Sequence, residues 1–288
     1  MENYLDNLKI KFNYSDDMIR LLNSVIPAII KVYGEEHIEM ILSAINECEI
    51  HIQGPTENMQ DYLNTYFDTQ EKWQIPTTGG AFYHKNIKIT DKGLESKSIV
   101  YIRTPYKKEF VLDNNKLDTI VHELCHAIKG YKKEKLINGK VYDSTGLNKD
   151  ICDIENGKIE VKETSMLGIE EALNSVTTAK ICELITGEYQ IKSYGRASRI
   201  AELLLQNDEL KKLLFRAQFK EDYDWIEYLG EENAKIICEN LDTLVNAMYA
   251  PWGEVNTPEK RKAHNERLNK LCEETYDFTS EILKSKIL

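Results

Sequence analysis

The sequence of 288 residues lacks the features of fibrous, disordered and membrane-spanning proteins. It has only 14 glycines and 6 prolines, while 42% of its residues are hydrophobic and 30% are charged. That balance excludes collagen-like and disordered chains and indicates a globular protein with a buried core. No stretch approaches the roughly 18 to 20 apolar residues of a membrane-spanning helix, so we expect no membrane partner.

Positive charge is also scarce. The chain has 37 lysines and arginines against 48 aspartates and glutamates, and its formal net charge is −11. Proteins that bind nucleic acid need clustered cations to displace counterions from the phosphates. The lysines here are interleaved with acids, as in residues 107–109 and 132–135, which is typical of solvated surfaces. We therefore expect no nucleic-acid partner.

The cysteines lack the spacing of a disulfide framework. All six lie far apart, and no Cys-x-x-Cys pair occurs. Residues 1–6 are acidic and lack the basic start and apolar middle of a secretory signal. We therefore expect reduced thiols and a cytoplasmic protein. The oligomeric state stays open.

What the sequence does contain predicts an α+β fold. Alternating polar and apolar residues predict strands at 49–53, 81–90 and 97–104, and two Asn-Gly pairs, at 138–139 and 156–157, predict hairpins. Apolar residues at helical spacing predict helices at 16–33, 35–47, 57–67, 115–129 and 167–186, with further helices after 193.

Single residues mark where these helices begin or bend. The predicted N-caps, whose side-chain oxygens can accept hydrogen bonds from the first turn, are Ser15, Thr56, Asn115 and Thr257. Pro27 is expected to kink or divide its helix. The order of elements predicts an N-terminal α+β lobe at 1–135, a β-hairpin connection at 136–166 and a helical lobe at 167–288.

One predicted helix carries the chemistry. Its residues 122–126 read HELCH, the H-E-x-x-H pattern. His122 and His126 lie one above the other on a helix, so both imidazoles can reach one metal ion at about 2.0–2.1 Å. Glu123 is rotated by about 100° and is placed to take a proton from a metal-activated water. Cys125 is expected to pack in the core.

A catalytic zinc site needs a third protein ligand and one open position. A histidine six residues after the second, with a glycine midway, is excluded because lysines occupy positions 132 and 129. A cysteine ligand of the deformylase type lacks its companion motif. The remaining option is a carboxylate from a later helix, where residues 168–175 offer Glu170 and Glu171.

With these residues the sequence resembles the gluzincin-type zinc metallopeptidases, in which a glutamate from a later Glu-Ala or Glu-Gly helix joins the two histidines. The resemblance covers about residues 113–187 and rests on His122, Glu123, His126 and Glu171, which directly precedes an alanine. It implies a zincin-like fold, with a small twisted sheet and the zinc-binding helix in the first lobe. It also implies Zn²⁺ bound by His122, His126 and Glu171, with Glu123 as the general base.

Further roles follow from the resemblance. Such families add a Tyr, His or Arg from the helical lobe to stabilise the oxyanion, and the candidates here are Tyr194 and Arg196. Where an acid often orients a ligand histidine, this chain has Ser175, so Asp118 is the alternative carboxylate. Glu170 is expected on a solvated helix start, which the helix dipole favours for an acid.

The implied function is hydrolysis of peptide bonds by a cytoplasmic zinc-dependent metallopeptidase. Its partner is a peptide or protein substrate, which an edge strand can bind in extended form. Two alternatives stay open: a zinc hydrolase acting on a non-peptide amide, and a catalytically silent zincin-like binding protein. The intact Glu123 counts against the silent protein, because a scaffold needs no base beside two ligands.

Overall fold

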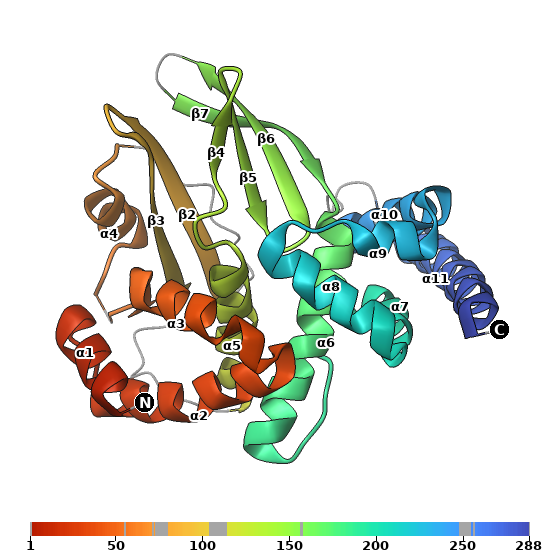
Figure 1. Cartoon of the computed structure of the whole chain (residues 1–288), viewed down its shortest axis with the longest axis horizontal. Coiled ribbons are helices and arrows are strands. Elements are labelled where there is room, and N and C mark those ends of the chain that lie inside the picture. The colour runs from red at the N-terminus through yellow and green to blue at the C-terminus, as the bar shows by residue number, and fades with distance from the viewer. Residues whose placement is uncertain are drawn as a thin grey trace. The chain divides into compact units, whose positions relative to one another are not determined.

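The computed structural model describes residues 2–54, 56–70, 72, 80–103, 114–155, 158–247, 255 and 257–287. Over these ranges the fold is α+β, as predicted, and Figure 1 shows the helices and strands. No helix in the described ranges is long and apolar enough to cross a membrane. The chain forms two compact units: the first comprises Met1–Tyr142, Cys152–Glu160 and Ile181–Glu188, and the second Asp143–Ile151, Val161–Lys180 and Tyr189–Leu288.

Helices open the first unit. They are α1 (Glu2–Phe12), α2 (Asp16–Tyr33), the 3-10 turn η1 (Glu35–His37) and α3 (Ile38–Glu47). Ser15 caps α2 as predicted, because its Oγ accepts a hydrogen bond from a first-turn N–H at 3.3 Å, and Gly34 follows its last turn. Of the two outcomes expected at Pro27, division of the helix is wrong, whereas a kink stays a prediction. α2 continues through Pro27 because Ile26 and Ile29, on either side, are fully buried.

A three-stranded sheet follows. Its strands are β1 (Cys48–Ile52), β2 (Ala81–Thr90) and β3 (Gly93–Ile102), in the spatial order β1-β3-β2. β1 runs parallel to β3, whereas β2 pairs antiparallel with β3, from Ala81 opposite Ile102 to Thr90 opposite Gly93. β2 is therefore an edge strand of the described sheet. It has the predicted bounds, while β3 begins four residues before the predicted 97 because the hairpin with β2 extends to Gly93.

Two more helices pack on this sheet, and both begin differently from the prediction. α4 (Met59–Phe67) is capped by Asn58 rather than Thr56, since the Asn58 side chain accepts hydrogen bonds from two N–H groups of the first turn. α5 (Asn114–Lys129) contains Asn115, which is therefore not its N-cap. α4 packs on β3, and α5 contacts β2, β3 and α3. The lysines at 107–108 lie outside the described residues.

A second sheet is a meander. Its strands are β4 (Lys135–Ile137), β5 (Lys140–Thr145), β6 (Asn148–Glu155) and β7 (Lys158–Ser165), in that spatial order. Asn138 and Gly139 form the predicted two-residue hairpin, with φ of 51° and 78°. The second predicted pair, residues 156–157, lies outside the described residues. A turn that was not predicted joins β5 to β6 through Gly146, with φ of 64°.

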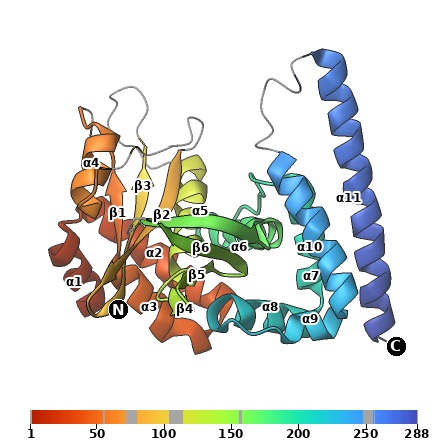
Figure 2. The same ribbon diagram turned by 90° about the horizontal axis from the view of Figure 1, so that it is seen from above.

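The rest of the described chain is helical. The helices are α6 (Leu167–Thr186), α7 (Gly195–Gln206), α8 (Asp208–Lys220), α9 (Asp224–Leu229), α10 (Glu231–Asn246) and α11 (Pro258–Ile287). α6 has the predicted bounds. Thr257 caps α11 as predicted, because its Oγ1 accepts a hydrogen bond from Lys260 N at 3.2 Å. α11 contacts α7 and α10, and Figure 2 shows it running alongside α10. All six cysteines are buried free thiols.

Candidate metal centre

α5 supplies two histidines from adjacent turns. His122 and His126 are 9% and 8% exposed, and their Nε2 atoms lie 3.2 Å apart. The intervening Leu124 and Cys125 are fully buried, so Cys125 packs in the core as expected. α5 therefore presents its two imidazoles from a helix whose other side is anchored in apolar packing.

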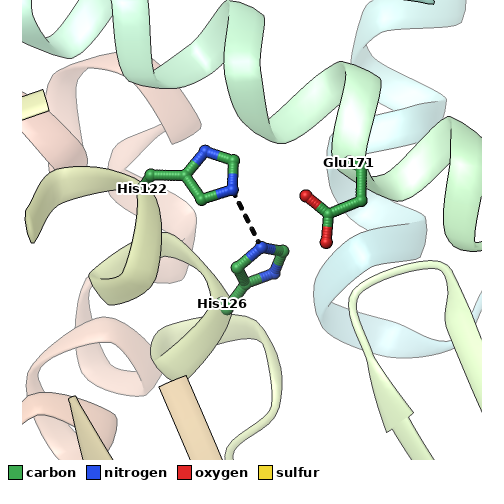
Figure 3. Close-up of side chains that lie close together, drawn as sticks. All are labelled: His122, His126 and Glu171. Carbon is green, nitrogen blue, oxygen red and sulfur yellow. Dashed lines mark hydrogen bonds between the residues drawn. The ribbon is translucent and has the colours of Figure 1, made fainter. Parts of the chain in front are cut away.

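The Glu171 carboxylate of α6 completes a group of three. One ligand atom from each of His122, His126 and Glu171 lies within 4.8 Å of the other two. Figure 3 shows the carboxylate directed towards the two rings, with the contact between the imidazoles dashed. Within the described residues, this is the one His, Cys, Asp or Glu group found that could hold a metal ion. The three predicted ligands thus come together.

The spacing of the two imidazoles suits a metal ion. Two ligands that each lie about 2.0–2.1 Å from a tetrahedral ion stand about 3.3 Å from each other. The 3.2 Å between the two Nε2 atoms is close to that value. Since two nitrogens and one oxygen fill three positions of a tetrahedron, such an ion would keep a fourth position for solvent or substrate. The group could therefore bind a metal ion.

Glu123 lies on α5 beside this group and takes a different partner. Its Oε2 accepts a hydrogen bond from the backbone N–H of Tyr83 on β2, at 2.7 Å. The Tyr83 N–H is therefore turned away from β3 and towards the helix. The bond fixes the carboxylate against edge strand β2, and the role of Glu123 as general base stays a prediction.

Glu170 is not on a solvated helix start, and that expectation is wrong. Its side chain is fully buried. Its Oε2 accepts hydrogen bonds from Leu147 N at 2.9 Å and from Gln218 Nε2 at 3.0 Å. These partners stand 23 and 48 residues away in sequence, so no local signal marked them. These hydrogen bonds offset the free-energy cost of burying the acid. The favourable helix dipole would not by itself bury it.

The two candidate oxyanion donors have different positions. Tyr194 directly precedes α7, has a left-handed backbone with φ of 51°, and is partly buried. Its role stays a prediction. Arg196 donates hydrogen bonds to Asn269 Oδ1 at 2.8 Å and to Asn265 Oδ1 at 3.1 Å, both on α11. Arg196 therefore joins α7 to α11.

The alternatives for orienting a ligand histidine are also placed. Ser175 donates its hydroxyl to the backbone oxygen of Glu171 at 2.9 Å, within α6. Asp118 is 7% exposed and lies on α5 one turn before His122, on the same face of the helix. Asp118 is thus in position to orient the histidine, and this role stays a prediction.

Two further histidines have surroundings that the sequence did not reveal. His51 Nε2 lies 2.9 Å from a Glu57 carboxylate oxygen, and the ring stacks on Tyr62 at 3.7 Å between centroids. His84 packs edge-on against Phe67 at 5.3 Å, and burial lowers the pKa of His84 to about 4. Both contacts join strands to α4, so they serve the first sheet.

Comparison of the chain with protein-family models, with curated proteins and with solved structures finds no match. The case for a function therefore rests on the residues and their geometry.

Proposed function

We propose that the protein is a zinc-dependent metallopeptidase. The observation that carries the proposal is the convergence of the H-E-x-x-H histidines and Glu171 within 4.8 Å. Glu123, on the same helix as the histidines, is held by the Tyr83 N–H. Two imidazoles and one carboxylate are a ligand set of catalytic zinc enzymes, and this set keeps one coordination position open.

The proposed division of labour assigns one task to each residue. His122, His126 and Glu171 would hold the zinc. When bound, zinc supplies Lewis acidity, which makes a water molecule acidic near neutral pH and polarises a carbonyl group. Glu123 takes the proton of the attacking water at its carboxylate and returns it to the departing amine.

The Tyr83 N–H supports this role of Glu123. A backbone donor at 2.7 Å fixes one carboxylate oxygen and so orients the proposed base. The same bond ties the base to edge strand β2. An extended peptide that paired with this edge would pass beside Glu123. This favours a peptide substrate over a small non-peptide amide. Tyr194 is the proposed oxyanion donor.

A cleavage assay tests the proposal. The full chain, loaded with one equivalent of zinc, is incubated with a random peptide library, and new termini are detected by mass spectrometry. We expect cleavage that stops when zinc is chelated. The matched control is Glu123→Gln, which keeps an acceptor for the Tyr83 N–H and should keep the zinc. Its kcat should fall about 10²- to 10⁴-fold, as loss of a general base does.

Other outcomes separate the alternatives. Turnover of small non-peptide amides without peptide cleavage would identify a different zinc hydrolase. Full zinc occupancy without turnover of either substrate class would identify a binding protein. A Glu123→Gln variant as active as the wild type would remove Glu123 from the mechanism.

A further inference from the structure

The first turn of α6, which carries Glu171, is held from two sides by contacts that metal ligation does not require. On one side, Gly168 N donates a hydrogen bond to Asp242 Oδ1 of α10 at 2.5 Å. On the other, the buried Glu170 carboxylate accepts from Leu147 N in the β5–β6 turn and from Gln218 Nε2 of α8. Three separate elements of the second unit therefore fix one helical turn.

Two glycines make these contacts possible. A Cβ at Gly168 would overlap Asp242 N and the carbonyl carbon of Leu241, so α6 approaches the α10 backbone as closely as it does only because position 168 has no side chain. A Cβ at Gly146 would overlap the Glu170 carboxylate, and Gly146 also has φ of 64°. Close backbone approach and left-handed φ are the two uses for which glycine is suited.

The contacts of Glu170 indicate that this residue serves to fix the direction of its side chain more than to fill buried space. An ionised carboxylate is costly to bury unless donors surround it, and a well-packed apolar side chain often fills such a position at least as favourably. Hydrogen bonds to a carboxylate are short and directional. The two donors on Glu170 therefore fix where the side chain points, which an apolar side chain would do less strictly.

The orientation of Glu170 sets that of its neighbour. Consecutive side chains on a helix differ by about 100° around the axis, so anchoring Glu170 fixes the rotation of the turn that carries Glu171. A carboxylate lies about 6 Å from the axis, and a rotation of about 20° would displace it by about 2 Å. Metal ligands tolerate displacements of only about 0.2 Å. The bond from Gly168 to Asp242 limits movement of the same turn along the axis.

We propose that Glu170 and Asp242 are positioning residues for the metal site, which together fix the rotation and height of the first α6 turn so that the Glu171 carboxylate faces His122 and His126. The inference rests on the proposed metal-binding function, and it assigns neither residue to the metal.

Metal affinity and a cobalt spectrum test the inference. The full chain and its variants are stripped of metal with a chelator. Zinc affinity is then measured by competition, and Co²⁺ is added to record its d–d absorption, which reports ligand geometry. Glu170→Leu removes the oxygen that accepts both hydrogen bonds; it should lower zinc affinity by about 10- to 100-fold, the usual effect of losing a group that supports a ligand, and should shift the cobalt band. Asp242→Ala should change both in the same direction.

The matched control is Thr177→Val. Thr177 is as buried as Glu170, and its hydroxyl donates to the carbonyl groups of Leu173 and Asn174, further along α6. These acceptors lie beyond the first turn of α6, so the zinc affinity of the variant should stay within about twofold of the wild type, with an unchanged cobalt band. Thermal unfolding of the metal-free proteins measures any loss of stability separately.

Wild-type affinity and an unchanged cobalt band in Glu170→Leu would overturn the inference, whatever its melting temperature. If that variant does not fold, Gln218→Leu, which removes one donor, replaces it; an affinity loss of about threefold or more supports the inference, and a smaller loss overturns it. No step depends on cleavage. A wild type that binds zinc but cleaves no peptide therefore refutes the proposed peptidase alone, whereas one that binds neither ion refutes both.

Discussion

α5 and α6 bring their ligand residues to the metal group by different means. On α5, His122 and His126 stand together because they are four residues apart on one helix. On α6, Glu171 is directed by a turn that α8, α10 and the β5–β6 turn hold through partners distant in sequence. The histidine pair is thus a local feature of the chain, whereas the position of the carboxylate is a property of the tertiary structure.

The largest effect is expected on the α5 side. His126→Ala removes a proposed ligand outright. Loss of a group that only supports a ligand lowers affinity by up to about 100-fold, and His126→Ala should lower zinc affinity by more than that. Calorimetric titration with zinc measures the change. Cys125→Ala, a change at the adjacent buried position, is the control and should keep wild-type affinity. Equal affinities in His126→Ala and the control would show that α5 does not hold the metal.

A fall in pH should change the stability of the surroundings of α5 and of α6 in opposite directions. Burial lowers the pKa of His84 in β2 to about 4, so the unfolded chain, in which a histidine has a pKa of about 6.5, binds the proton more readily. The stability contributed by neutral His84 is therefore complete above about pH 6.5 and is lost as the pH falls towards 4. The loss amounts to at most about 3 kcal/mol.

On the α6 side, the dependence of stability on pH has the opposite sign. Burial raises the pKa of Asp242, so the folded protein binds that proton more tightly than the unfolded chain, and this contribution to stability grows as the pH falls. Hydrogen exchange between pH 7 and 4.5 should show β2 losing protection before α6 does, and His84→Leu should remove the difference. Earlier loss in α6, or a His84→Leu profile like that of the wild type, would contradict this assignment.

A smaller effect is expected from Gly168→Ala. The new Cβ would overlap the α10 backbone, and overpacking of this kind costs about 1–3 kcal/mol. Gly195→Ala is the matched control, because a Cβ there meets no atom within 4 Å; it should cost about 0.5 kcal/mol or less. Urea denaturation measures both. Equal midpoints would show that α6 and α10 are not in close contact at position 168.

Features with local causes could be predicted from the sequence. α6 ends at Thr186 because Gly187, with φ of 80°, follows it, and the hairpin at Asn138 and Gly139 needs only two residues that accept positive φ. The start of α4 was misjudged by two residues, since Thr56 and Asn58 are both able to cap and only the folded turn shows which side chain reaches the free N–H groups.

Features with distant causes could not be predicted in this way. α2 runs through Pro27 because packing of its apolar side chains outweighs the lost hydrogen bond. The sequence near Glu170 does not indicate that Leu147 and Gln218 are its hydrogen-bond partners. Likewise, the sequence near Arg196 does not indicate its bonds to asparagines on α11. For the metal group, H-E-x-x-H identified two ligands by spacing alone, while the choice of Glu171 over Glu170 came from a family pattern.

Anomalous diffraction at the zinc edge, from crystals of the zinc-loaded full chain, tests the central claim most directly. The account predicts one strong peak, within about 2.0–2.2 Å of His122 Nε2, His126 Nε2 and a Glu171 carboxylate oxygen, with one position left to solvent. A peak bound by both histidines but not by Glu171, or no peak at all beside His122 and His126, would contradict it.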